Sequence, residues 1–513
     1  MTRRPAPNRR APQATRKESA PSHHPTPGFQ WPTMGELLDP RAPYLMPIAL
    51  ILITRIALAL YMPFAAEDAY ITFRFARNFA SGNGLVFNPG EHVFGFSSPL
   101  WTLWLALGFK VGAPPVAWAR VTTLALEIVT LVVVTAMLRR GFGHRSAWCF
   151  AFFFALWPYF SGVSVSGMEN QAMVALLALA SAGCASKSPL SGPALAALAL
   201  MRPEGLVASA IVAGWARWRD RWIAIALIAS AVVALTLYFG SPIPQSLVAK
   251  SRIYGTPGPW AGRHWWEWIS PFTLFRFPQI SDTGHLFLLT IVMAPSLWIG
   301  ARTLWPERSQ PVGAFVAGGL AIWLGYSLLG VVFFWWYLAV PLAAFAALAA
   351  IGFPKLSRGP ALDISVGLLI AGLWTVVPVL YLGRSQNESY SFANVSNFLQ
   401  RRVQPGQKVF LEPIGMVGYG APVRIIDEVG LVSPSVAARR MQGAGWYADV
   451  VRSERPDWLV VRRSVLSGGQ AFAGAGAPFR SAEERAAVFG GYTTEAADTT
   501  SGPNGLFVMS RRP

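Results

Sequence analysis

The feature that most constrains this chain is a succession of apolar runs between residues 44 and 381. A helix needs roughly 20 residues to cross the hydrocarbon core of a membrane. The chain is 53% hydrophobic and 13% charged, whereas soluble domains contain about 25% charged residues. We therefore predict an all-α polytopic membrane domain with about eleven transmembrane helices. The predicted spans are 44–64, 116–138, 146–160, 171–186, 191–201, 204–216, 222–239, 286–301, 312–332, 338–353 and 361–381.

Two stretches leave the number of spans open. Residues 191–216 fit either a broken pair of short helices or one long segment. Residues 99–112 are short for a span, and we interpret them as an interfacial or re-entrant helix.

The charges in the loops set the expected orientation, because cytoplasmic loops are enriched in Lys and Arg. Every loop on the side of the N-terminus is basic if residues 99–112 do not span. These loops contain Arg139, Arg140, Arg145, Lys187, Arg217, Arg219, Arg221, Arg302, Arg308, Lys355 and Arg358. We therefore expect a multi-pass protein of the bacterial inner (plasma) membrane, with a cytoplasmic N-terminus and a periplasmic C-terminal part.

The two ends of the chain have a different composition from the apolar region. Residues 1–43 begin with a basic, proline-containing segment that cannot bury enough apolar surface to fold, so a disordered cytoplasmic tail is expected. Residues 384–513 contain β-like stretches between Gly and Pro turns, which indicates a small α/β soluble domain. The net charge of +18 lies largely in the tail and loops, and without an aromatic-interleaved basic module we expect no nucleic-acid partner. Cys149 and Cys184 lie in apolar runs and are expected to be packing residues.

The first outer loop, residues 65–115, opens with a carboxylate pair at the edge of the membrane. Glu67 and Asp68 follow the first span directly. A carboxylate here can act as a general base on an acceptor hydroxyl; alternatively, the pair only caps an interfacial helix and favours its N-terminus. Arg74 lies further along the same expected helix and is suited to hold a phosphate leaving group.

Cations at the other outer turns run against the preference for positive charge on the inside. Arg202, in an Arg-Pro-Glu-Gly turn, and Lys250, beyond the seventh span, are therefore predicted to bind an anion together with Arg74. A membrane-embedded phosphate meets that requirement. Two short helices that meet at a charged Pro-Gly turn resemble the broken helices that present polar groups to ligands.

Carboxylates and aromatic residues occupy further outer turns. Glu169 and Glu204 are candidates for binding the sugar or the acceptor. Trp336 and Tyr337 fit either an interfacial aromatic belt or a surface that stacks on a sugar or prenyl group. Within the membrane, Arg55 and Glu127 lie near the middle of the first two spans and are predicted to form a buried structural pair.

These residues resemble a known family. The loop motifs are similar to the first-loop signature of GT-C superfamily glycosyltransferases that use polyprenyl-phosphate sugars, and most similar to terminal arabinofuranosyltransferase-like and family 39-like membrane enzymes. The similarity covers most of residues 44–465. It is carried by Glu67-Asp68-Ala69-Tyr70-Ile71, Arg74-Phe75-Ala76-Arg77-Asn78, Gly82-Asn83-Gly84, Asn88-Pro89-Gly90-Glu91, Gly95-Phe96-Ser97-Ser98-Pro99-Leu100-Trp101, Ser166-Gly167-Met168-Glu169, Arg202-Pro203-Glu204-Gly205, Trp336-Tyr337, Gly415-Met416-Val417-Gly418-Tyr419 and Ile426-Asp427-Glu428-Val429-Gly430-Leu431-Val432-Ser433-Pro434.

The resemblance implies a GT-C catalytic domain over residues 44–383 and an inverting transfer of a pentose or hexose from a lipid-phosphate donor. The family commonly begins the loop with two aspartates, whereas this chain has Glu67 first, so Asp68 is the better candidate for the base. The expected acceptor is a cell-envelope glycan or glycolipid. A lipid-linked-sugar transporter or flippase and a non-catalytic glycolipid-binding membrane protein are the alternatives.

A metal ion is an open question at the level of sequence. Glu67 and Asp68 carry hard oxygen ligands of the kind that Mg²⁺ or Mn²⁺ prefers. A phosphate leaving group beside several cations can do without one, so we expect no obligatory metal or other cofactor. The expected partners are the lipid donor, the acceptor and membrane lipid.

Overall fold

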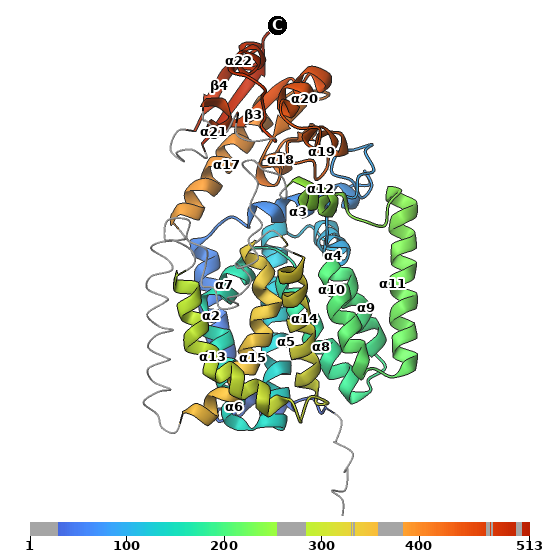
Figure 1. Ribbon diagram of the computed structural model, residues 1–513, viewed down its shortest axis with the longest axis vertical. Helices are drawn as coiled ribbons and strands as arrows, with labels where there is room; N and C mark the ends of the chain where they lie inside the picture. The colour runs from blue at the N-terminus through green and yellow to red at the C-terminus, as the bar shows by residue number, and fades with distance from the viewer. Residues whose placement is uncertain are drawn as a thin grey trace, which may run out of the picture.

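A computed structural model describes the chain over residues 29–253, 284–329, 331, 334–357, 383–467, 472, 476–498 and 505–513. A bundle of helices forms most of this structure, and a smaller domain with a β-sheet covers one end of it (Figure 1). The predicted span 361–381 and residues 1–28 of the predicted tail lie outside the described residues.

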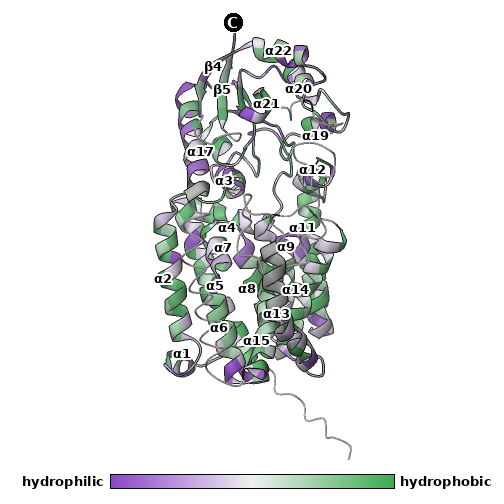
Figure 2. Ribbon diagram, turned by 60° about the vertical axis from the view of Figure 1, so that its left-hand side comes forward, coloured by the Kyte–Doolittle hydropathy of each residue, from purple (hydrophilic) through white to green (hydrophobic). Residues whose placement is uncertain are grey.

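The helices of the bundle coincide with the apolar runs of the sequence. These helices consist mainly of hydrophobic residues, and polar residues gather at the two ends of the bundle and in the smaller domain (Figure 2). The helices are α2 (Leu45–Tyr61), α5 (Pro115–Phe142), α6 (His144–Leu156), α7 (Pro158–Val165), α8 (Asn170–Ser186), α9 (Ser191–Met201), α10 (Pro203–Val212), η1 (Ala213–Trp215), α11 (Trp218–Phe239), α13 (Gly284–Leu304), α14 (Pro311–Leu328) and α15 (Ala339–Leu356).

Four helical segments of the described part are long and apolar enough to cross a membrane: Pro115–Phe142, Trp218–Phe239, Pro311–Leu328 and Trp335–Leu356. A fifth span would be the bent pair α6 and α7, which meet at 54°. The predicted run 146–160 is therefore interrupted, because Pro158 begins a new helix. A membrane-embedded helical fold is confirmed, and the total of eleven spans stays a prediction.

The helices α9 and α10 form a broken pair, which is one of the two forms predicted for residues 191–216. Arg202 has extended backbone dihedral angles, and Pro203 starts α10. Gly205 allows α10 to pack closely on α9, since a Cβ atom there would lie 2.0 Å from the carbonyl oxygen of Leu198. The break leaves Arg202 where the bundle meets the smaller domain, because Arg202 lines the same cavity as Leu431 of that domain.

A layer of short elements lies between the bundle and the smaller domain (Figure 1). The helix α3 begins at Glu67 and carries both predicted carboxylates in its first turn. The helix α4 covers much of residues 99–112 and is not among the candidate spans in the described part. The elements of this layer are α3 (Glu67–Ala80), α4 (Pro99–Lys110), α12 (Gln245–Ile253) and the 3₁₀ helix η3 (Trp335–Leu338).

The C-terminal domain is an α/β domain with a five-stranded mixed sheet of order β2-β1-β3-β5-β4. β2, β1 and β3 run parallel to one another, and β5 pairs antiparallel with both β3 and β4. Phe410 of β1 lies opposite Ile426 of β2 and Leu459 of β3. Its elements are α17 (Gly383–Arg402), β1 (Lys408–Leu411), α18 (Met416–Gly420), β2 (Arg424–Asp427), α19 (Pro434–Arg440), α20 (Trp446–Glu454), β3 (Trp458–Arg462), α21 (Arg463–Ser467), α22 (Ala482–Gly490), β4 (Tyr492–Ala497) and β5 (Leu506–Arg511).

Residues 29–43, which we predicted as part of the tail, contain the short helix α1 (Met34–Leu38). Thr33 and Glu36 form a capping box at its start. Glu36 also lies 3.3 Å from Nη1 of Arg139, at the far end of α5 from the C-terminal domain. This part of the chain therefore contacts the bundle.

Candidate active site

A small cavity of about 50 Å³ lies where the bundle meets the C-terminal domain. Six of the residues singled out in the sequence line it together, although they come from five separate segments of the chain. Asp68 shares this end of the molecule with Arg202 and Lys250, which the predicted site requires. The lining residues are Asp68, Ile71, Thr72, Gly95, Phe96, Ser97, Ser98, Met168, Glu169, Arg202, Ser246, Lys250, Trp336, Tyr337 and Leu431.

Asp68 and Lys250 form an ion pair across the cavity. Asp68 is in the first turn of α3 and Lys250 is in α12, and Nζ of Lys250 lies 3.6 Å from Oδ2 of Asp68. Both side chains stay about a quarter exposed, at 26% and 23%. Nζ of Lys250 also lies 4.8 Å from the centroid of the Phe334 ring. Both groups therefore remain accessible to a ligand.

Arg202 is held by two carboxylates at the break between α9 and α10. Its Nη1 atom pairs with Glu169, and its Nε atom lies 2.5 Å from Oε1 of Glu204. The hydroxyl of Tyr326 donates a hydrogen bond of 2.6 Å to the same oxygen of Glu204. Two negative charges thus compensate the single charge of Arg202.

Glu204 does not line the cavity. Its carboxylate is occupied by Arg202 and Tyr326, so the position does not agree with the predicted role in binding sugar or acceptor. Glu169 does line the cavity and contacts Arg202 from the other side.

The aromatic turn at η3 forms one wall. Tyr337 stacks on Tyr326 with ring centroids 5.4 Å apart, and the guanidinium of Arg202 lies 5.0 Å from the Tyr337 ring. The side chain of Asn170 donates a hydrogen bond of 3.0 Å to the carbonyl of Trp336. These contacts hold Trp336 and Tyr337 in place at the cavity. An interfacial aromatic belt would not require such specific contacts.

Glu67 lies beside Asp68 but points away from the cavity, toward the C-terminal domain. The backbone N–H of Gly415 donates a hydrogen bond to its carboxylate. Burial, together with the neighbouring carboxylates of Asp68 and Glu412, raises the pKa of Glu67 well above its usual value. This shift favours the neutral form of Glu67, since two adjacent carboxyl groups do not ionise with equal ease.

Arg74 lies outside the cavity, and its position does not agree with the predicted phosphate-binding role. Its guanidinium is buried and donates to backbone carbonyls from two parts of the chain. The acceptors are Phe87 at 2.8 Å, Ala421 at 3.1 Å, Val423 at 2.8 Å and Gly418. Burial, and then the neighbouring charge of Arg77, lowers the pKa of Arg74 to about 9. Arg74 therefore joins the first outer loop to the C-terminal domain.

Several polar residues of the cavity were not predicted from the sequence. Ser97 and Ser98 belong to the loop motif that carries the family resemblance, but neither was assigned a role. Ser246 lies one helical turn before Lys250, and its buried hydroxyl has no hydrogen-bond partner among the described residues. Leu431 comes from the C-terminal domain, and no local signal in the sequence connects it with this site.

The intramembrane pair lies apart from this cavity, inside the bundle. Nη2 of Arg55 lies 2.5 Å from Oε1 of Glu127, and both side chains are buried. Ser164 donates a hydrogen bond of 2.5 Å to the same carboxylate. Arg55 also donates to the carbonyl of Ala155 at 2.5 Å. The pair predicted from the sequence is present.

Comparison with solved structures identifies the architecture. ArnT from Cupriavidus metallidurans bound to undecaprenyl phosphate matches with a TM-score of 0.59, over 91% of this chain and 97% of that chain, at 12% identity. The apo form of the same protein matches with a TM-score of 0.56 over the same shares, also at 12% identity. The fold is that of the GT-C glycosyltransferases. This likeness confirms the GT-C fold that the outer-loop resemblance implies.

Sequence comparison agrees with the GT-C assignment. The terminal β-(1→2)-arabinofuranosyltransferase of Mycobacterium tuberculosis is 30% identical over 300 residues, which is 49% of this chain and 46% of that protein. The aligned part is thus about half the length of this curated relative. Residues 380–501 match a family model described as a domain of unknown function, DUF8728. This match covers most of the C-terminal α/β domain.

Proposed function

We propose that this GT-C protein is an integral membrane glycosyltransferase that moves a sugar from a polyprenyl-phosphate donor to a glycan or glycolipid acceptor on the periplasmic face. The observation that carries the proposal is the meeting of Asp68, Lys250 and Arg202 at one cavity beside the C-terminal domain. Two of these residues are cations and one is a carboxylate. The site thus offers binding groups for an anion next to a candidate general base.

Lys250 is the group we assign to the donor phosphate. The charge of Arg202 is already balanced by Glu169 and Glu204, whereas Lys250 faces Asp68 at the longer distance of 3.6 Å. A phosphate that approaches Lys250 competes with Asp68 for the ammonium. Donor binding would thereby free Asp68 to face the acceptor, and Arg202 would supply additional N–H donors at the edge of the phosphate.

Asp68 is the group we assign to the acceptor. It takes the proton of the acceptor hydroxyl as the acceptor oxygen forms a bond to the anomeric carbon of the donor. The bond from that carbon to the phosphate oxygen breaks on the opposite side, so the configuration inverts. The polyprenyl phosphate leaves with an additional negative charge, which Lys250 stabilises. Trp336 and Tyr337 are assigned to the sugar or the first prenyl units.

The positive charges of Lys250 and Arg202 are suited to the developing charge of the leaving group, so we propose that no metal is obligatory. Among the described residues, no group of three or more His, Cys, Asp or Glu side chains is arranged to hold a metal ion. Glu67 binds the N–H of Gly415 and does not line the cavity beside Asp68. Transfer that survives treatment with EDTA is the expected result.

The variant Asp68→Asn distinguishes a glycosyltransferase from the two alternatives, a lipid-linked-sugar flippase and a non-catalytic glycolipid-binding protein. The full-length protein is reconstituted with a panel of labelled polyprenyl-phosphate pentoses and hexoses and a cell-envelope glycan acceptor. We expect transfer by Asp68→Asn to fall by about 10²–10⁴-fold while the donor still binds. Glu67→Gln is the matched control and should lose much less, because its amide can still accept from Gly415.

Three outcomes would contradict this assignment. Full activity in Asp68→Asn removes Asp68 as the base. Movement of the labelled lipid across the membrane by the wild-type protein, without transfer to any acceptor, indicates a flippase instead. Donor binding without movement or transfer indicates the non-catalytic alternative.

A further inference from the structure

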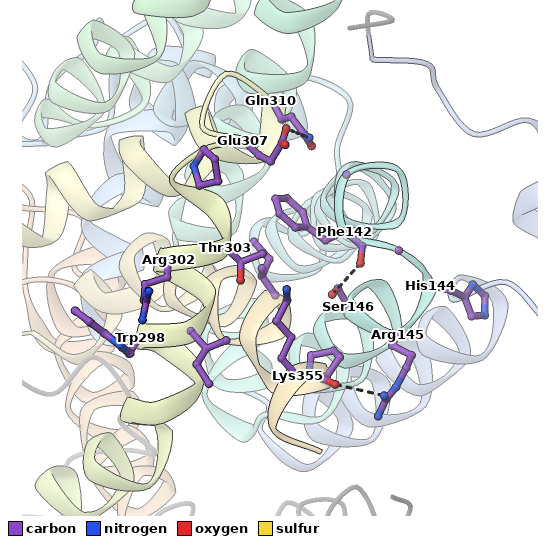
Figure 3. A pocket seen from close by; sticks show the side chains of 16 residues that line it. Phe142, His144, Arg145, Ser146, Trp298, Arg302, Thr303, Glu307, Gln310 and Lys355 are labelled. Atoms are coloured by element: carbon purple, nitrogen blue, oxygen red, sulfur yellow. Dashed lines mark hydrogen bonds between the residues drawn. The ribbon is translucent and has the colours of Figure 1, made fainter. Parts of the chain in front are cut away.

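A second and larger cavity, of about 1110 Å³, lies at the end of the bundle opposite the C-terminal domain (Figure 3). The turn between α5 and α6 forms one side of it, and the last turns of α13 and α15 form the other. This end corresponds to the cytoplasmic face in the predicted topology. It is separated from the candidate active site by the length of the bundle (Figure 1).

Three cations from three helices line this cavity. Arg302 lies in the last turn of α13, Lys355 in the last turn of α15, and Arg145 in the first turn of α6. The carboxylate of Glu307 also lines the cavity and accepts a hydrogen bond from Gln310. Among the described residues, Arg302 and Lys355 form no ion pair or hydrogen bond through their side chains. Arg145 donates hydrogen bonds of 3.3 and 3.2 Å to backbone carbonyls of α15 and the residue after it.

The lining also has an apolar part. Trp298 lies one helical turn before Arg302 and is 67% exposed, and Figure 3 shows the two side chains next to one another. Ile299 and Ile351 complete this wall. Tryptophan is enriched where a membrane meets water, so the cavity combines a cationic rim with a surface suited to the first carbons of a lipid.

Basic residues at helix C-termini have a simpler explanation, because they compensate the helix dipole and follow the positive-inside preference. That explanation applies to each cation separately. It does not account for Arg302 and Lys355 facing one shared cavity from two different helices. A basic pocket between helices at the cytoplasmic face is suited to an anionic lipid head group.

We propose that this cavity binds the phosphate head group of an anionic phospholipid from the inner leaflet. Arg302 and Lys355 contact the phosphate, and Trp298 contacts the acyl-glycerol region. This site is independent of the proposed glycosyl transfer, because it shares no residue with the cavity at Asp68.

Native mass spectrometry of the full-length protein in detergent, titrated with phosphatidylglycerol or phosphatidylcholine, tests the site. We expect tighter retention of phosphatidylglycerol by the wild type. The double variant Arg302→Gln/Lys355→Gln should bind it at least about tenfold more weakly. The matched control Arg219→Gln/Arg308→Gln removes two positive charges from the same end of the bundle but leaves the cavity lining intact, so it should bind like the wild type.

Equal losses in both double variants would overturn the proposal, since they would show a general effect of charge. The charge-conserving variant Arg302→Lys/Lys355→Arg should retain binding, which separates loss of the site from failure to fold. Inorganic phosphate supplied in excess distinguishes the source of the ligand. If it displaces the lipid from the wild type at micromolar concentration, the site takes free phosphate and the lipid assignment is wrong.

Discussion

The basic side chains near the C-terminal domain differ in what already surrounds them, and this decides what each can bind. The guanidinium of Arg74 is buried among backbone carbonyls of two segments. Arg202 is held by two carboxylates. Lys250 has Asp68 at 3.6 Å and stays 23% exposed. A phosphate can therefore gain most from Lys250.

Arg74→Lys is predicted to affect stability and not donor binding. Lysine keeps the positive charge, but its ammonium group cannot replace the planar guanidinium, which donates hydrogen bonds to several carbonyls at once. The carbonyl of Phe87 would keep its hydrogen bond from Asn78, but those of Ala421 and Val423 would lose the guanidinium, so we expect a loss of roughly 2–4 kcal/mol. Chemical unfolding of the full chain measures it. A fall in donor affinity at unchanged stability would show that Arg74 belongs to the site after all.

At this scale the sequence identifies residues better than it identifies their roles. Positive charge on the predicted outer side of the membrane indicated both Lys250 and Arg74 as candidates. The carbonyls that occupy Arg74 belong to residues 418–423, more than 340 positions away in the chain. No local pattern indicates that contact. The hydrogen bond that Tyr326 of α14 donates to Glu204 likewise joins residues far apart in the chain, so no local pattern predicts it.

At the scale of elements, two buried carboxyl groups lie at the C-terminal end of β2, Asp427 as its last residue and Glu428 directly after it. Asp427 accepts hydrogen bonds from the backbone N–H groups of Val429 and Val432, at 2.8 and 3.0 Å. Burial raises the pKa of Asp427 to about 6. Burial, followed by the charge of Glu412, raises the pKa of Glu428 to about 8. At neutral pH, Glu428 in the folded domain therefore holds a proton that the unfolded chain releases.

The C-terminal domain should lose stability as the pH rises from 5 to 8. Glu428 binds its proton more tightly in the folded domain than in the unfolded chain. Its contribution to the free energy of unfolding is therefore complete below the pKa of the unfolded chain, and it is lost as the pH rises through the pKa of the folded domain. The slope is at most about 1.4 kcal/mol per pH unit for this group. Thermal unfolding followed by near-ultraviolet circular dichroism at several pH values measures it. Glu428→Gln should flatten the dependence, and an unchanged slope in this variant would exclude Glu428 as its source.

The ion pair between α2 and α5 gives a prediction about the bundle. Glu127→Gln leaves Arg55 charged and buried without its partner, so we expect a loss of about 3–5 kcal/mol. Replacing both residues, as Arg55→Met/Glu127→Leu, should cost much less. Unfolding in mixed micelles compares the variants. A double variant as unstable as the single one would indicate that the polar contacts with Ser164 and Ala155 dominate.

The apolar runs predicted the positions of most described helices because lipid requires long uninterrupted hydrophobic segments. They predicted the ends of bent helices less well. Residues 146–160 carry one apolar pattern, but Pro158 separates α6 from α7 at an angle of 54°. Hydropathy does not register such a break.

At the scale of the whole molecule, the C-terminal domain completes the site. Leu431 lines the cavity, and Gln245 of α12 donates a hydrogen bond of 3.1 Å to the carbonyl of Gly430. Gly415 binds Glu67, next to the candidate base. The sequence predicted an α/β domain at this end, but it did not predict that the domain packs on α3 and α12. That packing depends on contacts between segments that are far apart in the chain.

The orientation in the membrane is testable with single cysteines in a Cys149→Ala/Cys184→Ala background. Thr494 is exposed on β4, and Arg219 is exposed at the start of α11, at the other end of the molecule. A membrane-impermeant maleimide should label Thr494→Cys in intact spheroplasts and Arg219→Cys only after permeabilisation. The reverse pattern would place the C-terminal domain in the cytoplasm and exclude a periplasmic active site.

The central claim is that a lipid monophosphate binds between Lys250, Arg202 and Asp68. Equilibrium binding of undecaprenyl phosphate to the full-length protein in nanodiscs tests it most directly. Lys250→Gln should bind about tenfold more weakly than the wild type, because it removes the accessible cation. Asp68→Asn should bind as tightly or more tightly, because it removes a carboxylate that competes with the phosphate. Undiminished binding by Lys250→Gln, or weaker binding by Asp68→Asn, would contradict the account.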